Sequence, residues 1–77
     1  MTKLGELGLS SYEEQAYRAL LALGSATASE VAEASGVPRG RIYDVLNGLE
    51  AREVVLSSGT EPTTYAAVDP ETAVDRL

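Results

Sequence analysis

Cysteine and histidine are both absent from the sequence, and their absence excludes several classes of site. Without cysteine, no disulfide can form and no thiolate can bind a metal. Zinc sites, Ser-His-Asp triads and Cys-His pairs are excluded together, since each requires one or both of these residues. The carboxylate pairs Glu13-Glu14 and Asp69/Glu71 lie in expected first turns of helices, where the helix dipole favours negative charge anyway. We therefore expect no enzymatic activity, no metal and no cofactor.

Long apolar runs and targeting segments are also missing. The longest apolar run is too short for a membrane-spanning helix, and residues 1–9 lack the basic and apolar regions of a signal peptide. We therefore expect a cytoplasmic chain with no membrane partner. The 77 residues allow one small domain, spanning 1–77. Because the chain has no Phe or Trp, its aromatic core is expected to come from Tyr12, Tyr17 and Tyr65.

Basic residues are scarce, and lysine occurs only at Lys3. The chain has twelve acidic and six basic side chains, for a net charge of −6. Such a chain has no general attraction to nucleic acid, and an acid-rich, lysine-poor composition is typical of a haloarchaeal cytoplasm. Residues 1–36 carry two bases and five acids, and residues 53–77 carry one base and five acids. Residues 37–52, with three bases and two acids, form the only net positive stretch.

Capping residues and helical spacing predict two helices in the first half of the chain. The first begins at Ser10 or Ser11, which have capping-box spacing to Glu13 and Glu14, and runs to Leu23 before Gly24. Its expected inward positions are Ala16, Tyr17, Leu20 and Leu23. A second capping box, Thr27-Ala28-Ser29-Glu30, starts a helix of about two turns that stops at Gly36. Val31, Ala32 and Ala34 are expected on its inward face or near it.

A third helix is predicted from Pro38, at its first position, to Arg52 or Glu53. The apolar stripe of this helix consists of Ile42, Val45, Leu46 and Leu49. At about 100° per residue, the opposite direction is occupied by Gly40, Asp44, Asn47 and Ala51. Arg41 and Tyr43 lie on the two flanks of that outward face.

A hairpin and a last helix are predicted in the remainder of the chain. The strands are expected over 54–57 and 63–68, on either side of turn residues 58–62, and residues 26–28 can add a third strand. A fourth helix starts at Pro70 and presents Ala73, Val74 and Leu77. Only Gly36-Val37 separates the second helix from the third, which is helix-turn-helix spacing. The expected fold is therefore a mainly α winged helix-turn-helix, with a three-helix core, a β-hairpin wing and a C-terminal fourth helix.

Four segments, residues 7–17, 26–32, 36–50 and 65–71, have a pattern similar to one known family, and 36–50 discriminates best. In them the chain resembles the N-terminal winged-helix domain of the TrmB family of archaeal transcription regulators. The resemblance implies that the helix over about 38–53 binds operator sites in double-stranded DNA, and that the protein is a homodimer. Nothing resembles the sugar-sensing domain of longer members, so no small-molecule ligand is expected in this segment.

Two positions depart from the pattern of that family. The wing tip of that family usually holds Lys or Arg, whereas residues 59–64 hold neither. This absence weakens the case for a contact between the wing and a DNA phosphate. Position 40 is Gly where a side chain such as Ser is common. This glycine costs the helix up to ~1 kcal/mol relative to Ala, but it lets the backbone approach DNA closely.

Arg39 and Arg41 are the main candidates for DNA contact. Both lie in the first turn of the third helix, where the helix dipole disfavours positive charge, so helix stability does not explain them. An arginine can instead bind a phosphate, or the O6/N7 edge of guanine, through two parallel hydrogen bonds. A solvated pair of arginines is the alternative.

Three more candidates on this helix have structural alternatives. Tyr43 either packs on the first helix or directs its hydroxyl to a phosphate. Asp44 is expected to pair with Arg41 or Arg39 in the free protein, and could instead accept from cytosine N4. Asn47 is an ordinary exposed side chain or contacts adenine.

The remaining candidates lie outside the third helix. Thr27 and Ser29 cap the second helix, whose free N–H groups could also hold a phosphate, and Thr60 lies in the expected wing. With the family resemblance, these residues predict a sequence-specific DNA-binding transcription regulator domain, and the acid-rich, lysine-poor composition indicates a halophilic source. The alternative is a winged-helix module that binds a protein through its acidic surface. The arginines favour DNA, because a protein-binding module does not need them at that position.

Overall fold

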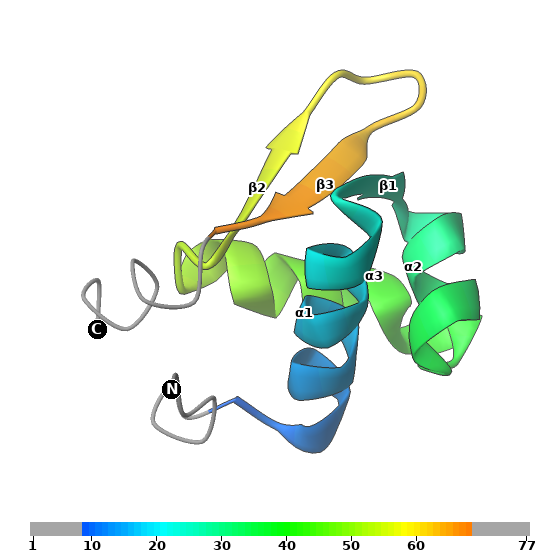
Figure 1. Ribbon diagram of the computed structural model, residues 1–77, viewed down its shortest axis with the longest axis vertical. Coiled ribbons are helices and arrows are strands. Elements are labelled where there is room, and N and C mark those ends of the chain that lie inside the picture. The colour runs from blue at the N-terminus through cyan, green and yellow to red at the C-terminus, as the bar shows by residue number, and fades with distance from the viewer. Residues whose placement is uncertain (1–8, 69–77) are drawn as a thin grey trace.

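Three helices and a small sheet enclose one core (Figure 1). The structure, a computed structural model, describes residues 9–68. Its elements in chain order are α1 (Ser11–Leu23), β1 (Ser25–Thr27), α2 (Ala28–Ser35), α3 (Arg39–Ala51), β2 (Val55–Ser58) and β3 (Thr64–Ala67). The fourth helix expected over 70–77 lies outside the described residues. No helix in residues 9–68 is long and apolar enough to cross a membrane.

Both predicted capping boxes form. At α1 the backbone N–H of Glu13 donates to Ser10 Oγ at 3.2 Å, and the Ser10 N–H donates to Glu13 Oε1 at 2.9 Å. Ser10 is therefore the cap, not Ser11. Thr27 and Glu30 form the same reciprocal pair at α2, with distances of 3.2 and 2.9 Å. Each box satisfies N–H groups that the first turn of a helix leaves without an intrahelical partner.

The predicted ends of α3 were wrong by one or two residues. Pro38 has an extended backbone, with ψ at 138°, so it precedes the helix as its cap and does not occupy the first helical position. The helix ends at Ala51, and two residues later Glu53 has a φ of 61°. A left-handed conformation stops helical hydrogen bonding and turns the chain towards β2.

The buried core contains the predicted stripe of α3 and the inward side chains of the other elements. Three core predictions were wrong, because Tyr12 is 38% exposed, Leu23 is 45% exposed and Ala34 is also exposed. All three lie in terminal turns of their helices. Spacing identifies which face of a helix is apolar, but it does not show how far along the axis a neighbouring element covers that face.

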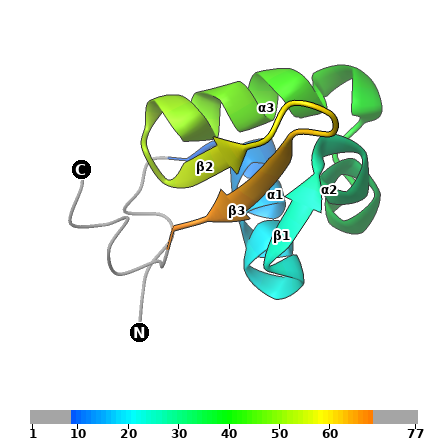
Figure 2. The same ribbon diagram turned by 90° about the horizontal axis from the view of Figure 1, so that it is seen from above.

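The hairpin and the additional strand form one antiparallel sheet with the order β1-β3-β2 (Figure 2). The strands start or end one residue away from their predicted limits. Tyr65, in the central strand β3, lies opposite Ala26 of β1 and Ser57 of β2. The Tyr17 hydroxyl of α1 donates to the carbonyl of Val68 at 2.5 Å, which connects the core to the end of the wing.

Candidate nucleic-acid interface

The outer face of α3 is free of other described elements, and all the candidate residues on this helix are exposed. In Figure 2, α3 runs along one edge of the molecule, beside the wing. Its four apolar stripe residues are buried, so the opposite side of the helix faces solvent. The exposed candidates are Arg39, Gly40, Arg41, Tyr43, Asp44 and Asn47.

The Arg39 side chain contacts α2. Its Nη1 donates to Ser29 Oγ at 2.6 Å, and its Nη2 lies 3.8 Å from Glu33 Oε2. Ser29 and Glu33 are four residues apart, so they lie on one face of α2, opposite the first turn of α3. The guanidinium group therefore has a defined position, although the side chain is 67% exposed.

The expected ion pair between Asp44 and either arginine does not form. Arg39 binds Ser29 and Glu33 instead. Arg41 is exposed and has no hydrogen bond or ion pair with any residue in 9–68. The two arginines therefore differ: one is positioned by α2, and the other extends from α3 with its donors available.

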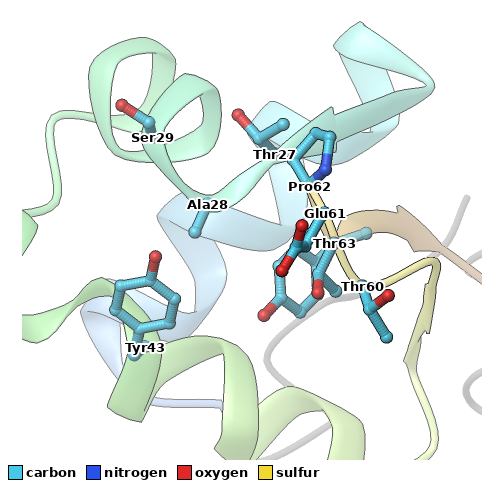
Figure 3. Close-up of a pocket in the computed structure, with 9 residues that line it drawn as sticks. Thr27, Ala28, Ser29, Tyr43, Thr60, Glu61, Pro62 and Thr63 are labelled. Carbon is cyan, nitrogen blue, oxygen red and sulfur yellow. The ribbon is translucent and has the colours of Figure 1, made fainter.

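Tyr43 faces a groove rather than packing on α1. The side chain is 63% exposed and lines a groove of about 500 Å³ between the start of α2, α3 and the loop of the wing (Figure 3). In Figure 3 the Tyr43 ring extends from α3 towards Ala28. The groove residues are Thr27, Ala28, Ser29, Tyr43, Thr60, Glu61, Pro62, Thr63 and Tyr65.

This groove brings together four residues that the sequence singled out separately: Thr27, Ser29, Tyr43 and Thr60. They come from the end of β1, from α2, from α3 and from the wing, so no spacing along the chain could have shown that they meet. Glu61 is the one charged side chain among the lining residues. The wing loop that borders the groove carries no basic residue.

Tyr65 is the groove residue that sequence reasoning missed. It was expected in the core, and it is 6% exposed, yet it also lines the groove. Burial raises the pKa of its phenol, and the negative charge of Glu50 and the neighbouring Tyr43 raise it further. Tyr65 is therefore a neutral hydroxyl that keeps its proton at physiological pH. The scarcity of aromatic residues predicted that Tyr65 lies in the core, but not that the groove opens beside it.

The two glycines of α3 have different surroundings. A Cβ at Gly40 would have nothing within 4 Å, so this position is open towards any partner of α3. A Cβ at Gly48 would lie 2.6 Å from Glu13 Oε2. Gly48 therefore allows close packing of α3 on the start of α1, a role that the sequence analysis did not assign.

The family model described as sugar-specific transcriptional regulator TrmB matches residues 4–71. The chain is 40% identical over 77 residues to the HTH-type sugar sensing transcriptional regulator TrmBL1 of Pyrococcus furiosus, covering all of this chain and 23% of that protein. It spans about a quarter of the length of the curated relatives it matches.

Solved structures have the same fold. The structure of TrmBL2, an archaeal chromatin protein described as showing a novel mode of DNA binding, is similar with a TM-score of 0.84 and 36% identity. That similarity covers 90% of this chain and 27% of the other. A MarR-family regulator from Silicibacter pomeroyi matches with a TM-score of 0.77 and 20% identity, covering 91% and 50%. The predicted winged-helix architecture is confirmed.

Proposed function

The chain belongs to the TrmB family of transcriptional regulators, and from this premise we propose that it binds specific sites in double-stranded DNA with α3 in the major groove. Relatives described as regulators and as DNA-binding proteins support the proposal. The observation that carries it is Arg41, which is exposed and unpaired within residues 9–68. The helix dipole disfavours a cation in this first turn, so an anionic partner explains it better than folding does.

The side chains of α3 divide into two kinds of DNA contact. Arg41 donates to the O6/N7 edge of guanine, and Asn47 and Asp44 lie on the same exposed face for contact with neighbouring bases. Arg39, held by Ser29, donates to a backbone phosphate. A Cβ at Gly40 would point into open space on the outer face of α3. Because glycine has no such atom, the helix backbone can approach the DNA more closely at this position.

Binding to a DNA duplex tests this proposal directly. A duplex is selected from a random-sequence pool by wild-type protein, and affinity is compared with that for an unselected duplex. We expect Arg41→Ala to weaken binding of the selected duplex by about 1–3 kcal/mol and to reduce sequence preference. Arg18→Ala is the matched control, because Arg18 is exposed on α1 and pairs with Glu14 at 2.8 Å.

The control should bind as wild type does. If Arg41→Ala also binds as wild type, α3 does not contact the bases as proposed. If no duplex is selected at any salt concentration, the better account is a winged helix that binds a protein through its acidic surface.

A further inference from the structure

The Tyr65 hydroxyl is a hydrogen-bonding group for which the fold provides no partner. It forms no hydrogen bond with any residue in 9–68, although the residue is only 6% exposed. Within this part of the chain, no fully buried side-chain oxygen or nitrogen lacks a partner. The Tyr65 hydroxyl oxygen must therefore be accessible to solvent. Tyr65 lines the groove, so we place the accessible side of this oxygen there.

Other hydroxyls around the groove are also free to donate. Thr27 Oγ1 and Ser29 Oγ each accept a hydrogen bond, from the Glu30 N–H and from Arg39, so their own protons remain available. Tyr43 has no hydrogen-bond partner within residues 9–68. The groove therefore gathers uncharged donors from the end of β1 and from α2, α3 and β3.

We propose that this groove binds the sugar–phosphate backbone of one DNA strand, and that hydroxyl donors led by Tyr65 and Tyr43 take the place of basic wing residues. The inference depends on the proposed function. With α3 in the major groove, the strand that borders it must pass between α3 and the wing, which is where this groove lies. Phosphate oxygens accept hydrogen bonds from tyrosine, serine and threonine as well as from cations.

Uncharged donors have a measurable consequence. A lysine or arginine on a phosphate releases a condensed counterion, so its contribution to affinity falls as salt rises. A hydroxyl carries no charge and releases none. Removing a hydroxyl contact therefore lowers affinity by the same factor at every salt concentration, whereas removing an arginine contact makes binding less dependent on salt.

Glu61 distinguishes a phosphate from other occupants of the groove. Its carboxylate is the only charge among the lining residues, and it repels a phosphate. If the backbone lies here, Glu61→Gln strengthens DNA binding. If the groove instead takes a cationic or amino-bearing group, the same substitution weakens binding of that group and leaves DNA affinity unchanged or lower.

The experiment measures affinity for a mixed-sequence DNA duplex at several salt concentrations. Tyr65→Phe and Tyr43→Phe each remove one hydroxyl, and Tyr12→Phe, in the first turn of α1, is the matched control. We expect the first two to bind about three- to tenfold more weakly, with an unchanged salt slope, as for the loss of one hydrogen bond. Thermal melts check that each variant is folded. If Tyr65→Phe is unstable, Tyr43→Phe still tests the groove, because Tyr43 is mostly exposed and its substitution leaves the core intact.

Each outcome separates the inference from the function on which it depends. If both groove variants bind as Tyr12→Phe does while Arg41→Ala binds more weakly, the domain binds DNA but its backbone does not lie in this groove. Weaker binding by Glu61→Gln would also overturn the inference. If wild-type protein binds no duplex at any salt concentration, the proposed function fails and the inference fails with it.

Discussion

At the scale of single residues, Arg39 and Arg41 are two residues apart yet have different roles in this account. Arg39 is positioned by Ser29 and lies beside Glu33, which competes with a phosphate for the same guanidinium. Such an exposed ion pair, 3.8 Å apart, contributes little to stability and can be exchanged for a phosphate. Arg41 has no such competitor in the described chain.

We predict that Arg39→Ala weakens binding to selected and unselected duplexes by similar factors. Its salt slope should fall by about 0.9, the value for one phosphate contact. Glu33→Gln should strengthen binding, because a carboxylate near the guanidinium is removed. Affinity measured against salt for both duplexes is the test, and a loss confined to the selected duplex would assign Arg39 to a base instead.

The titration of Tyr65 gives a second residue-scale prediction. Its folded pKa lies above the unfolded value of about 10 because of burial and then of Glu50 and Tyr43. The associated stability is fully present below pH 10 or so, and it is lost as pH rises through the folded pKa. Urea unfolding between about pH 9 and pH 12 should show this loss, and Tyr65→Phe should reduce it. Identical pH dependence in the two proteins would contradict the assignment.

Sequence reasoning identified the exposed residues of α3 but not their partners. Charge and the helix dipole were sufficient to select Arg39 and Arg41, because both effects act within one helix. The Ser29–Arg39 hydrogen bond and the opening beside Tyr65 depend on how separate elements pack. No single-helix rule contains that information. Asp44 was assigned to an arginine by spacing within the helix alone, and that pair does not form.

At the scale of elements, local chemistry accounts for most helix boundaries. The two capping boxes formed as predicted because their hydrogen bonds span only three residues. The ends of α3 were less predictable, since Pro38 serves as the cap and the turn at Glu53 is set by the path into β2. The order β1-β3-β2 required long-range pairing, and the sequence predicted only that residues 26–28 could join the wing.

The two glycines of α3 make a matched pair for testing that helix. Gly40→Ala should stabilise the fold by about 0.5–1 kcal/mol, because Ala has the higher helix propensity and its Cβ meets nothing within 4 Å. Gly48→Ala should gain nothing or lose stability, because its Cβ displaces the Glu13 carboxylate from the capping box of α1. Denaturant unfolding of both variants is the measurement, and equal gains would show that the Glu13 carboxylate moves aside without cost.

At the scale of the whole molecule, an acidic chain must bind an acidic polymer. The net charge is −6, and residues 37–52 form the only net positive stretch, by one charge. Binding there would depend on base contacts and uncharged hydrogen bonds more than on counterion release. That balance favours function at high salt, in keeping with the acid-rich, lysine-poor composition.

We predict a homodimer, because small domains often gain stability by pairing and paired domains bind two half-sites about one DNA turn apart. The segment 70–77, which supplies Ala73, Val74 and Leu77 to the expected interface, lies outside the described residues. Sedimentation equilibrium in molar potassium chloride is the measurement. A monomer at all protein concentrations would show that this chain alone does not pair.

The central claim is that α3 and the adjacent groove are the DNA-binding surface, and an NMR titration tests it most directly. Backbone amide shifts of the labelled protein are followed as the selected duplex is added. We predict that the largest changes fall in residues 39–47, in the wing loop 60–63 and at the start of α2. Changes confined to the exposed face of α1, with residues 39–47 unaffected, would contradict the account.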